Sequence, residues 1–324
     1  MQGSFRYAAQ VAYMGGNYSG WQRQERRIPA PDAALGHPWP SQHQERRIPA
    51  PDAALGHPWP SQHQERRPHA PDAAPGHPWP SQCQPPAEEH GEALGIQQVL
   101  EEALSRLSSS PVKVTGAGRT DKGVHALGQV ASFDLEKEWA PERLRLAVNF
   151  YLPEDVRVVR VFPVAAGFNA RRSALWREYR YFVWHGWVCP PHLNGRVWWR
   201  KADWDVELAR GACRLLEGEH DFRAFCRTGE CPDRSVRTLD RVRLQRWGAM
   251  SVLTVRAPSF LMNMVRIIVG NVDAVARGQR PMSWLSGLLE GEERNRSAMT
   301  APACGLWFWR AAYAELPDMK ALLS

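Results

Sequence analysis

The 324-residue sequence contains no hydrophobic run long enough to span a membrane. A membrane-spanning helix needs about 20 consecutive apolar residues, and no stretch approaching that length occurs. The first residues also lack the charged segment followed by an apolar run that marks a secretory signal. We therefore expect a cytoplasmic protein with no membrane partner.

Cysteine is scarce as well, with six residues at irregular spacing, so the sequence offers no disulfide framework. Cys226 and Cys231 have four residues between them, but no second pair at ligand spacing follows. This pattern favours reduced thiols over a zinc site, and we expect no metal site.

Acidic residues are outnumbered: 41 Lys and Arg face 34 Asp and Glu, which gives a net charge of +7. Residues 28–87 hold four arginines against five carboxylates, so the rest of the chain carries the whole positive excess. A basic excess suits a polyanionic partner, although a solvated charged surface would explain it nearly as well.

Residues 28–87 are poor in large apolar side chains and rich in proline. They comprise three copies of a 20-residue unit, of which 28–47 and 48–67 are identical and 68–87 differs at several positions. The segment holds 15 of the 26 prolines, and each copy offers only an isolated Leu or Trp to a core. Because so little apolar surface cannot offset the entropy lost on ordering, we predict a disordered or polyproline-like insertion rather than a repeat domain.

The remaining sequence alternates expected strands and helices. Alternating apolar residues predict a half-buried strand at 5–13, and apolar residues at helical spacing predict a helix at 96–107. Further strands are expected near 112–117, 128–134, 156–162, 177–184, 236–246, 251–257 and 305–311, and further helices near 141–151, 205–216, 262–277 and 281–289. Two successive α+β units of similar order are consistent with a split βαβ topology used twice.

A glycine-rich turn at 116–126, GAGRTDKGVHA, concentrates chemically capable side chains between two expected strands. It contains Arg119, Asp121 and His125. A carboxylate held beside a guanidinium stays ionised at neutral pH, as a nucleophile requires. The alternative is an ordinary β-turn with a structural Arg–Asp ion pair, since such pairs are common without function.

The whole string 116–126 closely resembles the signature loop of the TruA family of tRNA pseudouridine synthases. Further matches follow in the family's order: YSGWQRQ at 18–24, GIQ at 95–97, FNAR at 168–171, REYRY at 177–181, DF at 221–222, SFLMNMVR at 259–266 and GL at 305–306. The resemblance covers about residues 5–27 and 90–313 and leaves out the repeats.

The resemblance implies an α+β fold of two ferredoxin-like halves. These halves form one mixed, mainly antiparallel sheet, with helices on one side and an RNA cleft between the halves. We expect residues 1–27 plus 88–165 to form the N-terminal half, which carries the 116–126 loop, and residues 166–324 to form the C-terminal half. The insertion 28–87 stands outside both.

The same resemblance implies roles for four residues. Asp121 falls on the catalytic aspartate of the family, and Arg119 on an arginine that fills the gap left by the flipped base. Tyr179 falls on the tyrosine that stacks on the target uracil, and Arg266 on an arginine that pairs with the aspartate.

Local patterns leave alternatives open at some of these positions. Tyr179 and Tyr181 look like alternate residues of a strand, so one of them could be a core residue. Arg266 lies in an otherwise apolar helix and therefore needs a buried or cleft partner, for which Asp121 is a candidate. We interpret His125 as structural.

The resemblance further implies a homodimeric enzyme that isomerises uridine in the anticodon stem-loop of tRNA, at positions 38, 39 and 40, without a cofactor. A non-catalytic RNA-binding or tRNA chaperone protein on the same scaffold is the alternative. Lys122 and Asn169 depart from the commoner family residues, but neither change removes a carboxylate, a stacking ring or a guanidinium. A phosphate-binding enzyme is disfavoured because no helix directly follows the glycines.

Overall fold

The computed structural model describes residues 4–22 and 94–317. The repeats at 28–87, and the prediction made for them, lie outside the described residues. Within the described ranges, every helix is too short or too polar to cross a lipid bilayer.

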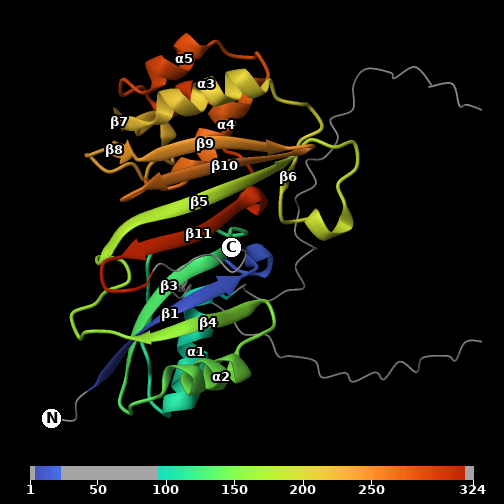
Figure 1. Ribbon diagram of the computed structural model, residues 1–324. Helices are drawn as coiled ribbons and strands as arrows, with labels where there is room; N and C mark the ends of the chain where they lie inside the picture. Colours follow the sequence, from blue (N-terminus) through green and yellow to red (C-terminus); the bar gives the residue numbers. More distant parts are fainter. Residues whose placement is uncertain (1–3, 23–93, 318–324) are drawn as a thin grey trace, which may run out of the picture. The chain divides into compact units, whose positions relative to one another are not determined.

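One sheet runs through the fold, with the strand order β4-β1-β3-β11-β5-β10-β9 (Figure 1). Its strands are β1 (Phe5–Tyr13), β3 (His125–Leu135), β4 (Val156–Pro163), β5 (Ala174–Trp184), β9 (Arg241–Trp247), β10 (Met250–Ala257) and β11 (Leu306–Tyr313), while the short β2 (Thr115–Gly116) pairs with β3 and β6 (Trp198–Trp199) with β5. The helices are α1 (Ile96–Ser108), α2 (Pro141–Tyr151), α3 (Val206–Leu216), α4 (Met264–Ala276) and α5 (Met282–Leu288).

The connections repeat one pattern twice. The N-terminal half follows β1-α1-β2-β3-α2-β4 and the C-terminal half follows β5-α3-β9-β10-α4-β11. In the sheet, the N-terminal half has the strand order β4-β1-β3-β2 and the C-terminal half has the matching order β11-β5-β10-β9. This is the split βαβ arrangement, so the predicted α+β fold with a mixed, mainly antiparallel sheet is confirmed.

The halves join where β11 runs parallel to β3, with Trp307 opposite His125 and Phe308 opposite Ala126. The same edge of β3 also receives β2, but only at Ala131 and Ser132. The strand predicted at 112–117 is therefore shorter than expected. Because β2 and β11 occupy different parts of one edge, the loop 117–124 lies between them.

The register carries one row of side chains across the sheet. Tyr13 is opposite Ala126, Ala126 opposite Phe308, and Phe308 opposite Tyr179. Residues directly opposite one another lie on the same face. Leu100 and Leu104 of α1 and Val148 of α2 line one small core cavity with Ala9 and Val11 of β1, so both helices cover this face in the N-terminal half.

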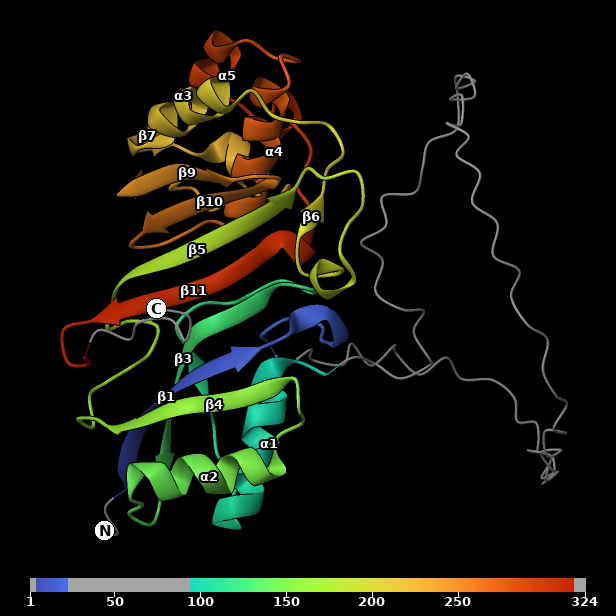
Figure 2. The same cartoon turned by 45° about the vertical axis from the view of Figure 1, so that its right-hand side comes forward.

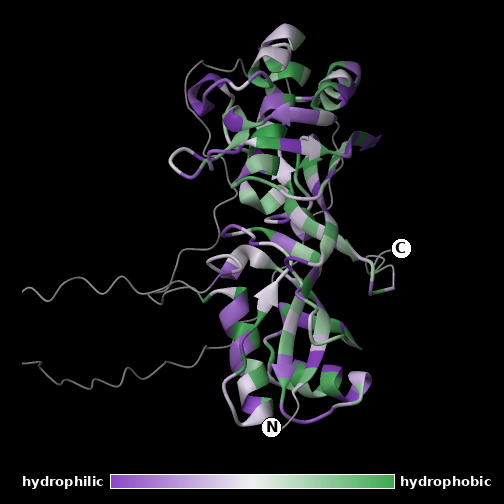
Figure 3. Cartoon of the chain, turned by 90° about the vertical axis from the view of Figure 1, so that its left-hand side faces the viewer, coloured by the Kyte–Doolittle hydropathy of each residue, from purple (hydrophilic) through white to green (hydrophobic). Residues whose placement is uncertain are grey.

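Local sequence explains most element boundaries. The apolar spacing of α1 buries Ile96, Val99, Leu100, Ala103 and Leu104, and hydrophobic and hydrophilic residues alternate in short bands along the ribbon (Figure 3). Helix α2 occupies the predicted range and has a proline at its start, where a missing N–H costs nothing.

Three details differ from the sequence prediction. Strand β1 is buried on both faces, not half-buried. The segment 168–170 lies against the face opposite the helices, where the Arg6 Nε donates to the Phe168 carbonyl and the Ala170 N–H donates to Oγ of Ser132, which pairs with Ala8. The strand expected at 236–246 divides at Asp240 into β8 (Val236–Leu239) and β9. Strand β8 pairs with β7 (Gly218–Asp221), whose polar sequence gave no strand signal.

The two described segments meet on either side of residues 23–93. The Ser19 N–H donates to the Leu94 carbonyl at 3.1 Å, the Ile96 N–H to Gly20 at 3.0 Å, and the Gln97 N–H to Trp21 at 2.8 Å. Main-chain hydrogen bonds therefore join residues 19–21 directly to residues 94–97.

Deleting residues 28–87 should leave the fold intact. The flanking segments are already bonded to each other, and shortening the connection from 71 to 11 residues lowers the loop-closure cost by only about 1.6 kcal/mol. We expect the melting temperature of the deletion variant to stay within a few degrees of the full chain in thermal unfolding.

A control variant sets the sensitivity of that measurement. A Cβ atom added at Gly116 would come within 2.3 Å of the Trp21 ring, so Gly116→Ala should lower the melting temperature clearly. If the deletion lowers the melting temperature as much as Gly116→Ala does, the repeats contribute to the folded structure and the prediction is wrong.

Candidate active site

An ion pair connects the glycine-rich loop to the C-terminal half. Nη1 of Arg266, in the first turn of α4, lies 3.0 Å from Oδ2 of Asp121, and the two side chains are 18% and 25% exposed. The residues are 145 positions apart in sequence. The structure thus gives Arg266 the partner that its apolar surroundings require.

The Arg266 guanidinium is held from further directions. Its Nε donates to the Ala301 carbonyl at 2.8 Å, and the Ala301 N–H donates back to the Arg266 carbonyl at 3.1 Å. Nη1 also lies 3.4 Å from Oδ1 of Asn263. These contacts already fix the Arg266 side chain, so pairing with Asp121 costs little additional side-chain entropy.

The loop that carries Asp121 is pinned by its neighbours. The Thr120 hydroxyl lies 2.8 Å from the Tyr13 hydroxyl, and the Thr120 carbonyl accepts from the Trp21 N–H at 2.9 Å. Gly20 has φ +106°, and a Cβ atom there would come within 2.5 Å of the Thr120 carbonyl oxygen. Glycine is required at this contact, and the loop is preorganised before any substrate binds.

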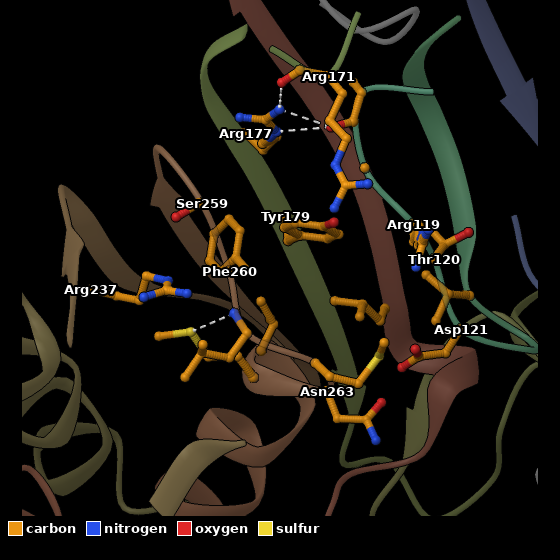
Figure 4. A pocket seen from close by; sticks show the side chains of 18 of the residues that line it. Arg119, Thr120, Asp121, Arg171, Arg177, Tyr179, Arg237, Ser259, Phe260 and Asn263 are labelled. Atoms are coloured by element: carbon orange, nitrogen blue, oxygen red, sulfur yellow. Dashed lines mark hydrogen bonds between the residues drawn. The ribbon is translucent and has the colours of Figure 1, made fainter. Parts of the chain in front are cut away.

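Tyr179 forms an aromatic wall beside the ion pair. Its ring meets Phe260 edge-on at a centroid distance of 5.0 Å (Figure 4). It meets Phe308 edge-on at 5.1 Å. Burial raises the pKa of the Tyr179 hydroxyl well above its ordinary value, so the group is protonated at neutral pH.

The neighbouring tyrosine on the same face has a different environment. Tyr181 is fully buried and donates to the Pro302 carbonyl at 2.7 Å. Tyr179 instead lines an open cavity. Of the two candidates, only Tyr179 can meet a ligand.

The cavity has a volume of about 580 Å3 and a strongly basic lining. Two carboxylates, Asp121 and Glu230, line it together with five arginines: Arg119, Arg171, Arg172, Arg177 and Arg237. This excess of positive charge favours a polyanionic ligand.

Arg119 is exposed at this cavity and makes no ion pair with any carboxylate in residues 4–22 and 94–317. The structural Arg–Asp pair considered within the turn is therefore absent, because Asp121 turns to Arg266 instead.

Sequence reasoning did not assign a role to Arg177, although this residue begins the REYRY segment. Its Nε and Nη2 both donate to the Ala117 carbonyl, at 3.0 and 2.9 Å, and its Nη1 donates to the Pro258 carbonyl at 2.6 Å. Arg177 therefore ties the start of the loop to strand β5. The sequence did contain a signal for this role, because an arginine within a largely buried strand needs several hydrogen-bond acceptors.

His125 is structural, as expected, but its partners lie outside the loop. Nδ1 accepts from the Gly15 N–H at 3.1 Å, Nε2 lies 3.0 Å from the Gly195 carbonyl, and the ring stacks on Trp307 at 4.4 Å. Burial lowers the pKa of His125 to about 4, so the ring is neutral at physiological pH.

No group of three His, Cys, Asp or Glu side chains in the described ranges could hold a metal ion. Cys226 and Cys231 are free thiols. The arrangement offers a carboxylate, an aromatic wall and several arginines, which suits chemistry at a sugar whose flanking phosphates bind the arginines.

Comparison with known proteins agrees with this chemistry. The family model described as tRNA pseudouridine synthase matches residues 83–171 and 212–314, which include Asp121 and Arg266 but not Tyr179. Among solved structures, a Cbf5-Nop10-Gar1 complex matches with a TM-score of 0.28 and 13% identity over 55% of this chain and 40% of that chain, a likeness too low to inform fold or function.

Curated relatives are more similar. The tRNA pseudouridine synthase A of Hydrogenovibrio crunogenus is 39% identical over 68% of this chain and 84% of its own length. The enzymes of the same name from Pseudoalteromonas atlantica and Beijerinckia indica are 37% and 40% identical, over 72% and 70% of this chain and 90% and 88% of theirs. The chain belongs to the tRNA pseudouridine synthase family.

Proposed function

We propose that this protein converts uridine to pseudouridine in tRNA, with Asp121 as the catalytic residue. The observation that carries the proposal is the Asp121–Arg266 ion pair, whose carboxylate lines one cavity with Tyr179 and a basic rim. The conversion is an isomerisation: the bond from uracil N1 to ribose C1′ breaks, a bond from C5 to C1′ forms, C5 loses a proton and N1 gains one. No cofactor is needed.

Asp121 supplies the charge that this chemistry requires. Its carboxylate faces the fixed Arg266 guanidinium, and it can either attack C1′ or remove a ribose proton. The target base must leave its stack to reach such a group, because the cavity admits a nucleotide but not a paired helix.

Tyr179 suits the binding of the flipped base, and Arg119 suits the filling of the space that the base leaves. Tyr179 offers a ring on which the freed uracil can stack, and its raised pKa favours a hydrogen-bonding hydroxyl over a proton-accepting phenolate. Arg119 is exposed and free to enter the space that the base leaves in the RNA. The rim arginines Arg171, Arg172 and Arg237 would bind phosphates.

The family resemblance supports finer proposals. We place the target uridines at positions 38, 39 and 40 of the anticodon stem-loop, and we propose a cytoplasmic homodimer. Residues 1–27 plus 88–165 and residues 166–324 are proposed as its two halves, with 28–87 as an insertion. The alternative of a non-catalytic RNA-binding protein is disfavoured, because such a protein has no need to keep the carboxylate, the tyrosine and the arginine together.

Asp121→Asn should reduce pseudouridine formation to below roughly one-thousandth of the wild-type rate, while tRNA binding stays similar. The amide keeps the size and hydrogen bonding of the side chain but removes its charge. Single-turnover kinetics and filter binding on the same preparation measure both quantities. Turnover near the wild-type rate would refute the role of Asp121.

Arg266→Leu should lower the single-turnover rate by about 100-fold or more, since it leaves Asp121 without its partner. Arg266→Lys keeps the charge but cannot reproduce both the Ala301 and the Asp121 contacts, so we expect an intermediate rate. Thermal unfolding of both variants controls for loss of fold. Unchanged rates in both would place Arg266 outside the mechanism.

Tyr179→Phe and Tyr179→Leu separate stacking from hydroxyl chemistry. If stacking dominates, the Phe variant keeps its activity and the Leu variant loses about 1–3 kcal/mol of base-binding free energy. If the hydroxyl takes part in proton transfer, the Phe variant binds tRNA normally but turns over slowly. Wild-type kinetics in both variants would show that Tyr179 does not touch the base.

A further inference from the structure

Arginines also converge at the outer edge of the C-terminal half, away from the active-site cavity. A second cavity of about 480 Å3 lies there and shares no lining residue with the first. Six arginines from α3, β5, β9 and β11 line it: Arg180, Arg210, Arg214, Arg241, Arg243 and Arg310. We call this the edge cavity. Strands β9, β10 and β5 lie side by side there (Figure 2).

The β5 residues that line the edge cavity lie on the other face of the sheet from Tyr179, and α3 borders the cavity at the sheet edge beside β9. Tyr179 lines the active-site cavity, whereas its neighbours Glu178 and Arg180 line the edge cavity. Consecutive residues of a strand point to opposite faces, so the two cavities are separate sites.

Carboxylates within the described chain do not neutralise the edge cavity. Glu178 is the one acidic residue in its lining, and this buried side chain already holds Arg180 at 3.5 Å and Arg310 at 3.4 Å. Arg210 pairs with Glu207 at 2.7 Å. The remaining three, which are Arg214, Arg241 and Arg243, form no ion pair within residues 4–22 and 94–317, so the cavity carries a surplus of positive charge.

Protection of a sheet edge does not account for this arrangement. Charged residues on an edge strand can keep other strands from pairing with it, which would explain Arg241 and Arg243. The edge is already capped at Val242, however, because Glu217 Oε1 accepts the Val242 N–H at 2.8 Å. Edge protection also gives no reason for Arg214, on α3, to face the same cavity.

We propose that the edge cavity binds RNA phosphates, supplied by parts of the tRNA outside the stem-loop that carries the target uridine. The inference rests on the proposed function and adds a second RNA contact to it. The charge surplus favours a polyanion, and the same charge disfavours a second copy of this chain, whose own arginines would face these across a symmetric interface. Strands β5 and β9 are two strand spacings apart, about 10 Å, a span that a folded tRNA covers easily.

A triple variant tests the proposal. Arg214→Gln, Arg241→Gln and Arg243→Gln together should weaken full-length tRNA about tenfold in Kd and reduce the slope of log Kd against log salt by about 2 to 3. Filter binding at several KCl concentrations measures both quantities. The isolated anticodon stem-loop should bind the variant as well as it binds the wild type, because the active-site rim is unchanged.

Two further variants serve as controls. Arg106→Gln, Arg143→Gln and Arg160→Gln remove the same charge from exposed positions that line neither cavity, and should change tRNA binding much less. Replacing the three edge arginines by Lys keeps their charge and should preserve the salt slope, since phosphate contacts depend chiefly on charge.

The outcomes separate the two proposals. Unchanged tRNA affinity and slope in the Gln triple variant, or an equal loss for tRNA and stem-loop, would overturn the edge-cavity assignment. A changed sedimentation coefficient without RNA would overturn it too, in favour of a protein interface. Pseudouridine formation by the wild type is measured separately, so its absence would refute the proposed function without deciding the binding result.

Discussion

The parallel pairing of β11 with β3 determines where every functional group lies. Only Trp307 and Phe308 pair with β3, at His125 and Ala126, yet this short junction joins the two halves of the sheet. It places the end of the 117–124 loop beside the strand that neighbours β5, and hence beside Tyr179. A shift of one residue in this register would turn Phe308 to the other face and remove one of the two rings that pack against Tyr179.

The active site combines an ion pair, for which burial is costly, with an aromatic ring, for which burial is favourable. The Asp121–Arg266 pair keeps partial contact with solvent, so neither ion bears a full desolvation cost. Tyr179 is 7% exposed, packs against the rings of Phe260 and Phe308, and lines the cavity. Such a site can hold the Asp121 carboxylate beside a Tyr179 ring that is apolar enough to bind a base.

Local sequence patterns predicted the elements well and their partners poorly. The apolar spacing and initial proline of α2, like the spacing of α1, depend on neighbours in the chain, so both helices were predictable. The partner of Arg266 was predictable only as a requirement: an arginine in an apolar helix needs an acceptor, but the spatial proximity of Asp121 follows from strand pairing across 145 residues. The short β2 and the polar β7 depend on tertiary contacts alone. The edge cavity also escaped sequence analysis, because its arginines lie far apart in the chain and meet only when β9 and α3 pack together.

The main-chain bonds between residues 19–21 and 94–97 bear on how the repeats could arise. They join the loop after β1 to the start of α1, so the sheet exerts almost no selection on the length of what is inserted between them. Each doubling of such an insertion costs only about 0.6 kcal/mol of loop-closure entropy. Tandem duplication of a 20-residue unit can therefore accumulate at this point, and two copies can remain identical, while a duplication inside any strand of the sheet would be eliminated.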